Sequence, residues 1–281
     1  MIAVLSKALA RTFVFGANQN KQSMILVQIS GTLRNLANVE DSYGLLIHCK
    51  VLPQLCQIYG DARFRGHKEL ILNVSRLLSK VSIDFNCAEQ MVQTKNTAVF
   101  LDAMQLYKEN SAVLIRIAFV LGNLTTHYEG ARKELCCAED CFVKVIGLAQ
   151  FYLEKDIQGV NKIKEIDQGK AKSKKYEEFN AGNIEDAITK IVKLVANLST
   201  EETYAGQKLV RADSVQMVQQ FVSTLVKAID KRTIDDNEEF ILNAISCITN
   251  VLFYDIPSKE LLNDDIRISI FNSIKLYILA T

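Results

Sequence analysis

Apolar side chains recur along most of the chain at intervals of three and four residues. Between Lys68 and Val81 they occupy positions 70, 71, 74, 77, 78 and 81, which is the pattern of a helix with one buried face. Similar stripes predict helices over 113–124, 184–198 and 239–252. Because each stripe needs a partner surface, the pattern predicts an all-α fold of packed helices.

Five of the predicted helices end in the same short motif, in which two apolar residues flank a polar one. The copies are centred on Asn35, Lys80, Asn123, Asn197 and Asn250, at successive intervals of 45, 43, 74 and 53 residues. The 74-residue interval contains a charged insertion at 154–183, and removing these 30 residues leaves 44. A period of 43 to 45 is typical of armadillo and HEAT repeats, whose units are two or three helices.

The repeats predict a single armadillo-type right-handed helical solenoid over 1–281, with about five repeats plus partial terminal repeats. In the first repeat we expect helices over 23–39, 41–49 and 51–59. Residues 2–15 and 266–279 are expected to form the terminal helices, and the insertion a mobile loop or a short exposed helix. Neither end carries an obviously polar capping repeat, although terminal repeats normally need one for solubility. A piece of a longer chain would show the same lack.

Composition supports helices and restricts the classes of partner. With 2 prolines and 12 glycines, the chain lacks the turn residues that many hairpins need. A net charge of +1 gives no general attraction to nucleic acid or membranes, and no apolar run approaches the length of a bilayer span, so we expect a soluble protein. Seven scattered cysteines suggest buried thiols in a reducing compartment.

Candidate chemistry is sparse. None of the three histidines belongs to a zinc-protease pattern, and the spacing of Cys136, Cys137 and Cys141 matches no established zinc box. No glycine-rich turn of the phosphate-binding type occurs. We therefore expect a non-enzymatic protein with no metal and no cofactor, whose partners are other proteins.

The motif helices predict a binding surface. On each helix, the positions four and seven residues before the motif lie within about 40° of it. The candidate groove residues on this face are Asn35, Asn73, Arg76, Lys80, Arg116, Asn123, Lys190, Lys193, Asn197, Asn243 and Asn250. Five cations and no acid in the three rows suit an acidic or extended segment of a partner. The alternative is that each asparagine satisfies neighbouring backbone groups without any ligand.

These motifs resemble the armadillo repeat, in which an asparagine of the third helix faces a concave groove. The segments 68–80, 115–125 and 237–243 also resemble the ciliary armadillo repeat-containing protein 2 family, over roughly 20–255. The resemblance implies a scaffold or adaptor of motile cilia, involved in assembling or anchoring radial spokes. Partners would then be axonemal or radial-spoke components, and the location the cytoplasm and the axoneme of a cilium or flagellum.

Two departures sharpen this interpretation. Lys80 replaces the family's asparagine in the second repeat, which interrupts a continuous ladder of asparagines. The chain has no tryptophan, whereas nuclear-import receptors with armadillo repeats stack basic cargo on tryptophans, so such cargo is disfavoured. Two alternatives stay open: a purely architectural axonemal part, or a cytosolic or mitochondrial scaffold, since the first 39 residues hold four cations and no acid.

Overall fold

The computed structural model describes residues 1–14, 18–167 and 174–254, together with positions 268, 271 and 272. Regular structure in these ranges is helical throughout. The helices are α1 (Ile2–Val14), α2 (Gln19–Leu36), a short 3₁₀ helix (Glu40–Ser42), α3 (Tyr43–His48), α4 (Val51–Gly60), α5 (Lys68–Val81), α6 (Phe85–Val92), α7 (Thr97–Leu106), α8 (Ser111–His127), α9 (Glu129–Cys137), α10 (Cys141–Asp167), α11 (Lys174–Leu198), α12 (Glu202–Leu209), α13 (Ala212–Ile229) and α14 (Ile234–Leu252).

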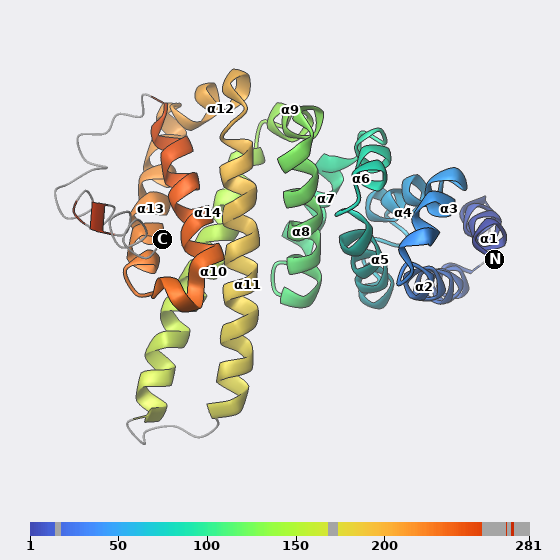
Figure 1. Ribbon diagram of the computed structural model, residues 1–281, viewed down its shortest axis with the longest axis horizontal. Helices are drawn as coiled ribbons and strands as arrows, with labels where there is room; N and C mark the ends of the chain where they lie inside the picture. The colour runs from blue at the N-terminus through green and yellow to red at the C-terminus, as the bar shows by residue number, and fades with distance from the viewer. Residues whose placement is uncertain (15–17, 168–173, 255–267, 269–270, 273–281) are drawn as a thin grey trace. The chain divides into compact units, whose positions relative to one another are not determined.

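The chain packs as two compact units, Met1–Glu134 and Leu135–Thr281, and each is described by itself. In the first unit the long helices follow one another side by side: α2 packs on α5, and α5 packs on α8 (Figure 1). The shorter helices α4 and α7 lie against them and against each other. Each long helix is thus followed by two shorter ones, which is the three-helix repeat that the sequence predicts.

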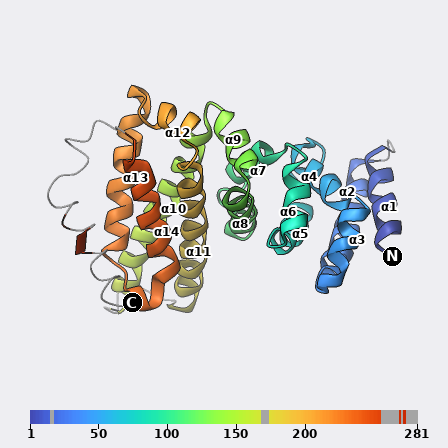
Figure 2. The ribbon, with the colours of Figure 1, turned by 45° about the horizontal axis from the view of Figure 1, so that its top comes forward.

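In the second unit α10 packs on α11 and α13, while α14 packs on α11 and α13 (Figure 2). The far ends of α10 and α11 extend beyond α13 and α14 as a pair of helical arms (Figure 1). These arms occupy the described part of 154–183, where we expected a loop or a short helix; residues 168–173 lie outside the described residues. Lysine and glutamate are good helix formers, so their abundance in this segment is compatible with helix.

Helix α5 has the bounds that its apolar pattern predicts. His67 caps its start, because the Nδ1 atom of this side chain accepts a hydrogen bond from the Leu70 backbone nitrogen at 3.3 Å. The six apolar side chains of the pattern are completely buried. By contrast, α2 ends at Leu36 rather than at Val39, because the Val39 nitrogen bonds the Leu36 carbonyl in a tighter turn.

Side-chain hydrogen bonds between repeats recur at the predicted period. In the first unit their partners are Gln90 and Ile47, Tyr107 and Arg65, and Tyr128 and Phe85, which are 43, 42 and 43 residues apart. In the second unit the Tyr254 hydroxyl donates to the Ser199 carbonyl, 55 residues away, close to the predicted interval of 53. The repeat length read from the sequence therefore reappears as the distance along the chain between bonded partners.

Two further expectations concern helices and thiols. Among the helices of the described ranges, none combines the length and apolarity that a membrane span requires. All seven cysteines carry free thiols, and five of them are buried, whereas Cys49 is partly exposed and Cys137 is exposed. Most thiols therefore act as small apolar groups of the core, as the sequence predicts.

Candidate protein-binding surface

The first unit brings six of the predicted groove residues onto its three long helices. Asn35 and Arg116 are exposed, and Asn73, Arg76, Lys80 and Asn123 are partly exposed. Adjacent helices are in register at this level, because a Cβ atom added at Gly31 of α2 would lie 4.0 Å from the Asn73 Nδ2 atom of α5. We call these six residues the unit 1 row.

Arg34, which the sequence patterns did not single out, joins the first two asparagines. Its guanidinium donates to the Oδ1 atom of Asn73 at 3.0 Å and to the Oδ1 atom of Asn35 at 3.3 Å. Both amide oxygens are therefore occupied, whereas the amide nitrogens have no partner among the described residues. At this end the row offers N–H donors, which suit a carbonyl or carboxylate acceptor.

The two cations of α5 differ in their surroundings. The Lys80 ammonium donates to the Oδ1 atom of Asn38 at 2.6 Å, whereas the Arg76 guanidinium has no hydrogen-bond or ion-pair partner in the described ranges. Beside Lys80 lies a hollow of about 550 Å³ lined by Glu40, Asp41 and Asp84. Arg76 is therefore the better candidate for an anion contact, since acids border Lys80.

Tyr43 lines the same hollow, and its pKa is affected by some of these acids. Burial, and then the negative charge of Glu40, raise the pKa of Tyr43 above its ordinary value. Acidic side chains thus border the unit 1 row at Lys80. The apolar pattern of each separate helix did not predict them.

Asn123, on α8, contacts the preceding repeat. Its amide nitrogen donates to the Ser82 hydroxyl at 3.0 Å, while its amide oxygen has no partner among the residues described. An asparagine in this position can therefore join two repeats through one end and accept a backbone N–H of a ligand through the other.

The second unit places the remaining five residues on α11 and α14. Lys190, Lys193, Asn197, Asn243 and Asn250 are all partly exposed. The Asn250 amide nitrogen donates to the Ala196 carbonyl at 3.0 Å, so the structural role of the motif asparagine is observed here. Lys193 has no partner among the described residues.

The expectation that the basic stripe has no compensating acid is wrong at Lys190. Lys190 is compensated, because its ammonium lies 2.7 Å from the Oε1 atom of Glu239 and 3.9 Å from the Oδ1 atom of Asp186. Both acids lie one helical turn before the three rows that we read in the sequence, as does Glu69 on α5. One additional helical turn of the sequence pattern therefore predicts acidic side chains next to the basic ones.

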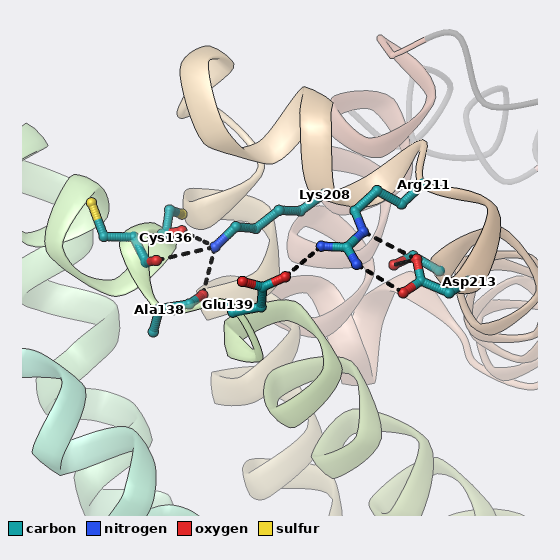
Figure 3. Close-up of polar contacts among 8 residues, drawn as sticks. Cys136, Ala138, Glu139, Lys208, Arg211 and Asp213 are labelled. Carbon is teal, nitrogen blue, oxygen red and sulfur yellow. Dashed lines mark hydrogen bonds and ion pairs between the residues drawn. The ribbon is translucent and has the colours of Figure 1, made fainter.

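A second polar cluster, at the start of the second unit, was not predicted (Figure 3). The Lys208 ammonium of α12 lies 2.5 Å from the Cys136 carbonyl and 2.6 Å from the Ala138 carbonyl, at the C-terminal end of α9. A cation satisfies the unpaired carbonyls of a helix end and favours the negative end of its dipole. Next to it, Arg211 donates to Glu139 at 2.7 Å. The cluster joins elements 70 to 72 residues apart and has a structural role.

Comparison with solved structures decides the fold type. The structure titled designed armadillo repeat protein YIII(Dq)4CqI superposes with a TM-score of 0.58 and 14% sequence identity, covering 98% of this chain and 99% of that chain. The fold is of armadillo type. The predicted all-α fold of armadillo-type repeats is therefore confirmed.

Comparison with curated proteins confirms the predicted resemblance. The chain is similar to armadillo repeat-containing protein 2 of Bos taurus, Homo sapiens and Mus musculus, with 24%, 25% and 26% identity over 236, 236 and 239 residues. These matches cover 84% of the chain and 26% of each relative, so the chain spans about a quarter of the length of these curated relatives. No protein-family model matches it.

The structure also shows the surroundings of the clustered cysteines singled out in the sequence. In the part of the chain that the structure describes, no three histidine, cysteine or acidic side chains gather as metal ligands would. Cys136 and Cys141 are completely buried, and a hydrogen bond between their side chains, together with burial, raises the pKa of the Cys136 thiol. A buried, protonated thiol behaves as a core residue.

Proposed function

We propose that this armadillo scaffold is an adaptor of motile cilia that takes part in assembling or anchoring axonemal radial spokes. The support for the cellular role is the resemblance to armadillo repeat-containing protein 2 over 84% of the chain. The proposed location is therefore the cytoplasm and the axoneme. The proposed partners are axonemal or radial-spoke proteins, with no nucleic acid, membrane or cofactor involved.

The binding surface that we propose is the unit 1 row. The observation that carries it is the guanidinium of Arg76, which has no partner among the described residues and lies on α5, between the amide-bearing helices α2 and α8. A carboxylate of a partner would pair with Arg76. The amide nitrogens of Asn35 and Asn73 would donate to carbonyl groups, and the free oxygen of Asn123 would accept a backbone N–H. This pattern suits an extended acidic segment.

In the second unit, we propose a smaller contribution from the groove residues Lys193, Asn197, Asn243 and Asn250. Lys190 contributes least, because Glu239 already neutralises its charge. A partner carboxylate would have to compete with this ion pair.

Affinity purification of the tagged chain from ciliated cells tests the proposal. The Arg76→Glu, Arg116→Glu variant should lose axonemal proteins that the unaltered chain retains, because two attractive contacts become repulsive. The matched control is Arg65→Glu, Lys68→Glu, which makes the same change of charge at exposed positions outside the row. Retention of the same partners by the row variant would instead favour the architectural alternative.

The location of the tagged full-length protein tests the cellular role separately. We expect signal along the axoneme of motile cilia. A diffuse or mitochondrial signal would defeat the ciliary role and leave the general scaffold interpretation in place.

A further inference from the structure

A hollow of about 510 Å³ lies between α1 and α2, away from the unit 1 row. Its walls are formed by one stripe of α1 and one side of α2. The lining residues are Val4, Lys7, Ala8, Arg11 and Thr12 on α1, and Gln22 and Ile25 on α2. All of them belong to the first compact unit.

The polar side chains of Thr12 and Gln22, which line the hollow, are hydrogen-bonded within the protein. The Thr12 hydroxyl donates to the Ala8 carbonyl at 2.8 Å, and the Gln22 amide nitrogen donates to the Thr12 carbonyl at 3.0 Å. Apolar side chains remain accessible beside these bonds, since Val4 is 69% exposed and Ile25 is 48% exposed. The hollow therefore favours an apolar ligand surface over a hydrogen-bonding one.

The rim of the hollow is basic. Lys7 and Arg11 lie one turn apart on the exposed side of α1, and neither has a hydrogen-bond or ion-pair partner among the described residues. Residues 1–39 contain no acid, so no side chain of this segment neutralises them. Charge complementarity therefore requires acids on the occupant.

The size of the hollow fits a helix. From Val4 to Arg11 the stripe covers two turns of α1, or about 10 Å at 1.5 Å per residue. An amphipathic helix places apolar side chains at every third and fourth position, so two turns supply two or three anchors for such a groove. Acids beside these anchors would lie next to Lys7 and Arg11.

We propose that the hollow between α1 and α2, with its apolar walls at Val4 and Ile25 and its cations Lys7 and Arg11, binds an acidic amphipathic helix of a partner protein. A membrane surface is disfavoured, because the most apolar side of α1 is already used: Ile2 and Leu9 are buried in the protein. A helix that inserts into a bilayer surface needs that side free.

Binding of fluorescein-labelled helical peptides of about 18 residues tests the proposal, with leucine at every third and fourth position and glutamate beside the leucines. The comparison peptide carries lysine in place of glutamate. By fluorescence anisotropy, the 281-residue chain should bind the glutamate peptide about tenfold more tightly, and added salt should reduce the difference.

Variants locate the binding. Lys7→Glu, Arg11→Glu should reverse the preference between the two peptides, and Val4→Asp should weaken binding of both. The Arg76→Glu, Arg116→Glu variant should bind the glutamate peptide as the unaltered chain does, which separates this site from the unit 1 row.

Four results would overturn the proposal. They are equal binding of both peptides, loss of binding in the Arg76→Glu, Arg116→Glu variant, a dimer in light scattering that Val4→Asp dissociates, and co-sedimentation with phosphatidylserine vesicles that Val4→Asp abolishes. The last two would identify a second copy of the chain or a membrane as the occupant. Circular dichroism of each variant checks that it is folded.

Discussion

The Asn123 amide nitrogen lies 3.0 Å from the Ser82 hydroxyl oxygen, which belongs to the preceding repeat, 41 residues earlier in the chain. The equivalent asparagine of the last repeat, Asn250, donates to the Ala196 carbonyl of its own neighbour. The motif asparagine thus helps to hold repeats in register. A binding role, if present, uses the part of the amide that this bond leaves free.

We predict that Asn123→Ala lowers the free energy of unfolding by about 1 kcal/mol, because it removes a hydrogen bond and leaves the Ser82 hydroxyl without this partner. Urea titration of Asn123→Ala, Ser82→Ala and the double variant should give a coupling energy. The cycle is needed because Ser82 also donates to the Ser79 carbonyl at 3.0 Å.

Asn243→Ala is the control for this experiment, since Asn243 is a partly exposed motif-face asparagine with no partner in the described ranges. It should change stability by less than about 0.5 kcal/mol. If the effects of Asn123→Ala and Ser82→Ala on the free energy of unfolding simply add in the double variant, the hydrogen bond between these two side chains contributes nothing to stability.

Lys208→Met should destabilise the second unit by about 2 kcal/mol, because a charged donor no longer satisfies carbonyls at the end of α9. The apolar stem of methionine keeps the packing of the lysine side chain. Thermal unfolding measures the loss, and Lys227→Met, at an exposed lysine of α13, is the matched control. Equal melting temperatures for Lys208→Met and Lys227→Met would contradict the stabilising role of Lys208.

Arg232 and Asp156 form a largely buried ion pair, and we predict that Arg232→Met lowers the free energy of unfolding by about 3 kcal/mol. The guanidinium lies 2.9 Å from the Asp156 carboxylate, and 8% and 12% of the two side chains are exposed. Its central carbon also lies over the Phe240 ring, 4.5 Å from the ring centroid. Removing the cation leaves Asp156 buried without its charge partner.

The double variant Arg232→Met, Asp156→Leu should recover part of that stability in urea titration, because it removes both charges. A double variant less stable than Arg232→Met would contradict the assignment of the cost to an unpaired carboxylate.

Thiol labelling should follow burial. Burial raises the pKa of Cys56 to about 12, and burial likewise raises the pKa of Cys247, so both stay protonated and unreactive near neutral pH. We predict that iodoacetamide first modifies the exposed Cys137 in the folded protein and reaches all seven cysteines only after denaturation. Peptide mass spectrometry identifies the sites. Cys137→Ser should remove the rapid phase, and rapid labelling of Cys56 would contradict its buried position.

The long helices were predictable because their apolar stripes are local signals. The bounds of α5 agree with the pattern from Lys68 to Val81 at both ends. The arms of α10 and α11 were less predictable, because a charged composition is compatible with either a solvated loop or an exposed helix. Composition alone does not decide between them.

The candidate site was predictable only in part. Periodicity placed the asparagines on the long helices, but it did not reveal the Arg34 bridge or the pairing of Lys190 with Glu239. Such partners come from neighbouring helices about one repeat away. Finding them requires the register between repeats, which a reading of each helix by itself does not supply.

The repeat-spaced hydrogen bonds have a consequence for synthesis of the chain. Since Tyr107 bonds Arg65 and Tyr128 bonds Phe85, a bond of this kind becomes possible each time roughly forty more residues have left the ribosome. The sequence separation of such partners depends on repeat length rather than on chain length, so the loop that must close does not grow as the protein lengthens. Each new repeat can therefore use the one before it as a template while the rest of the chain is still unmade.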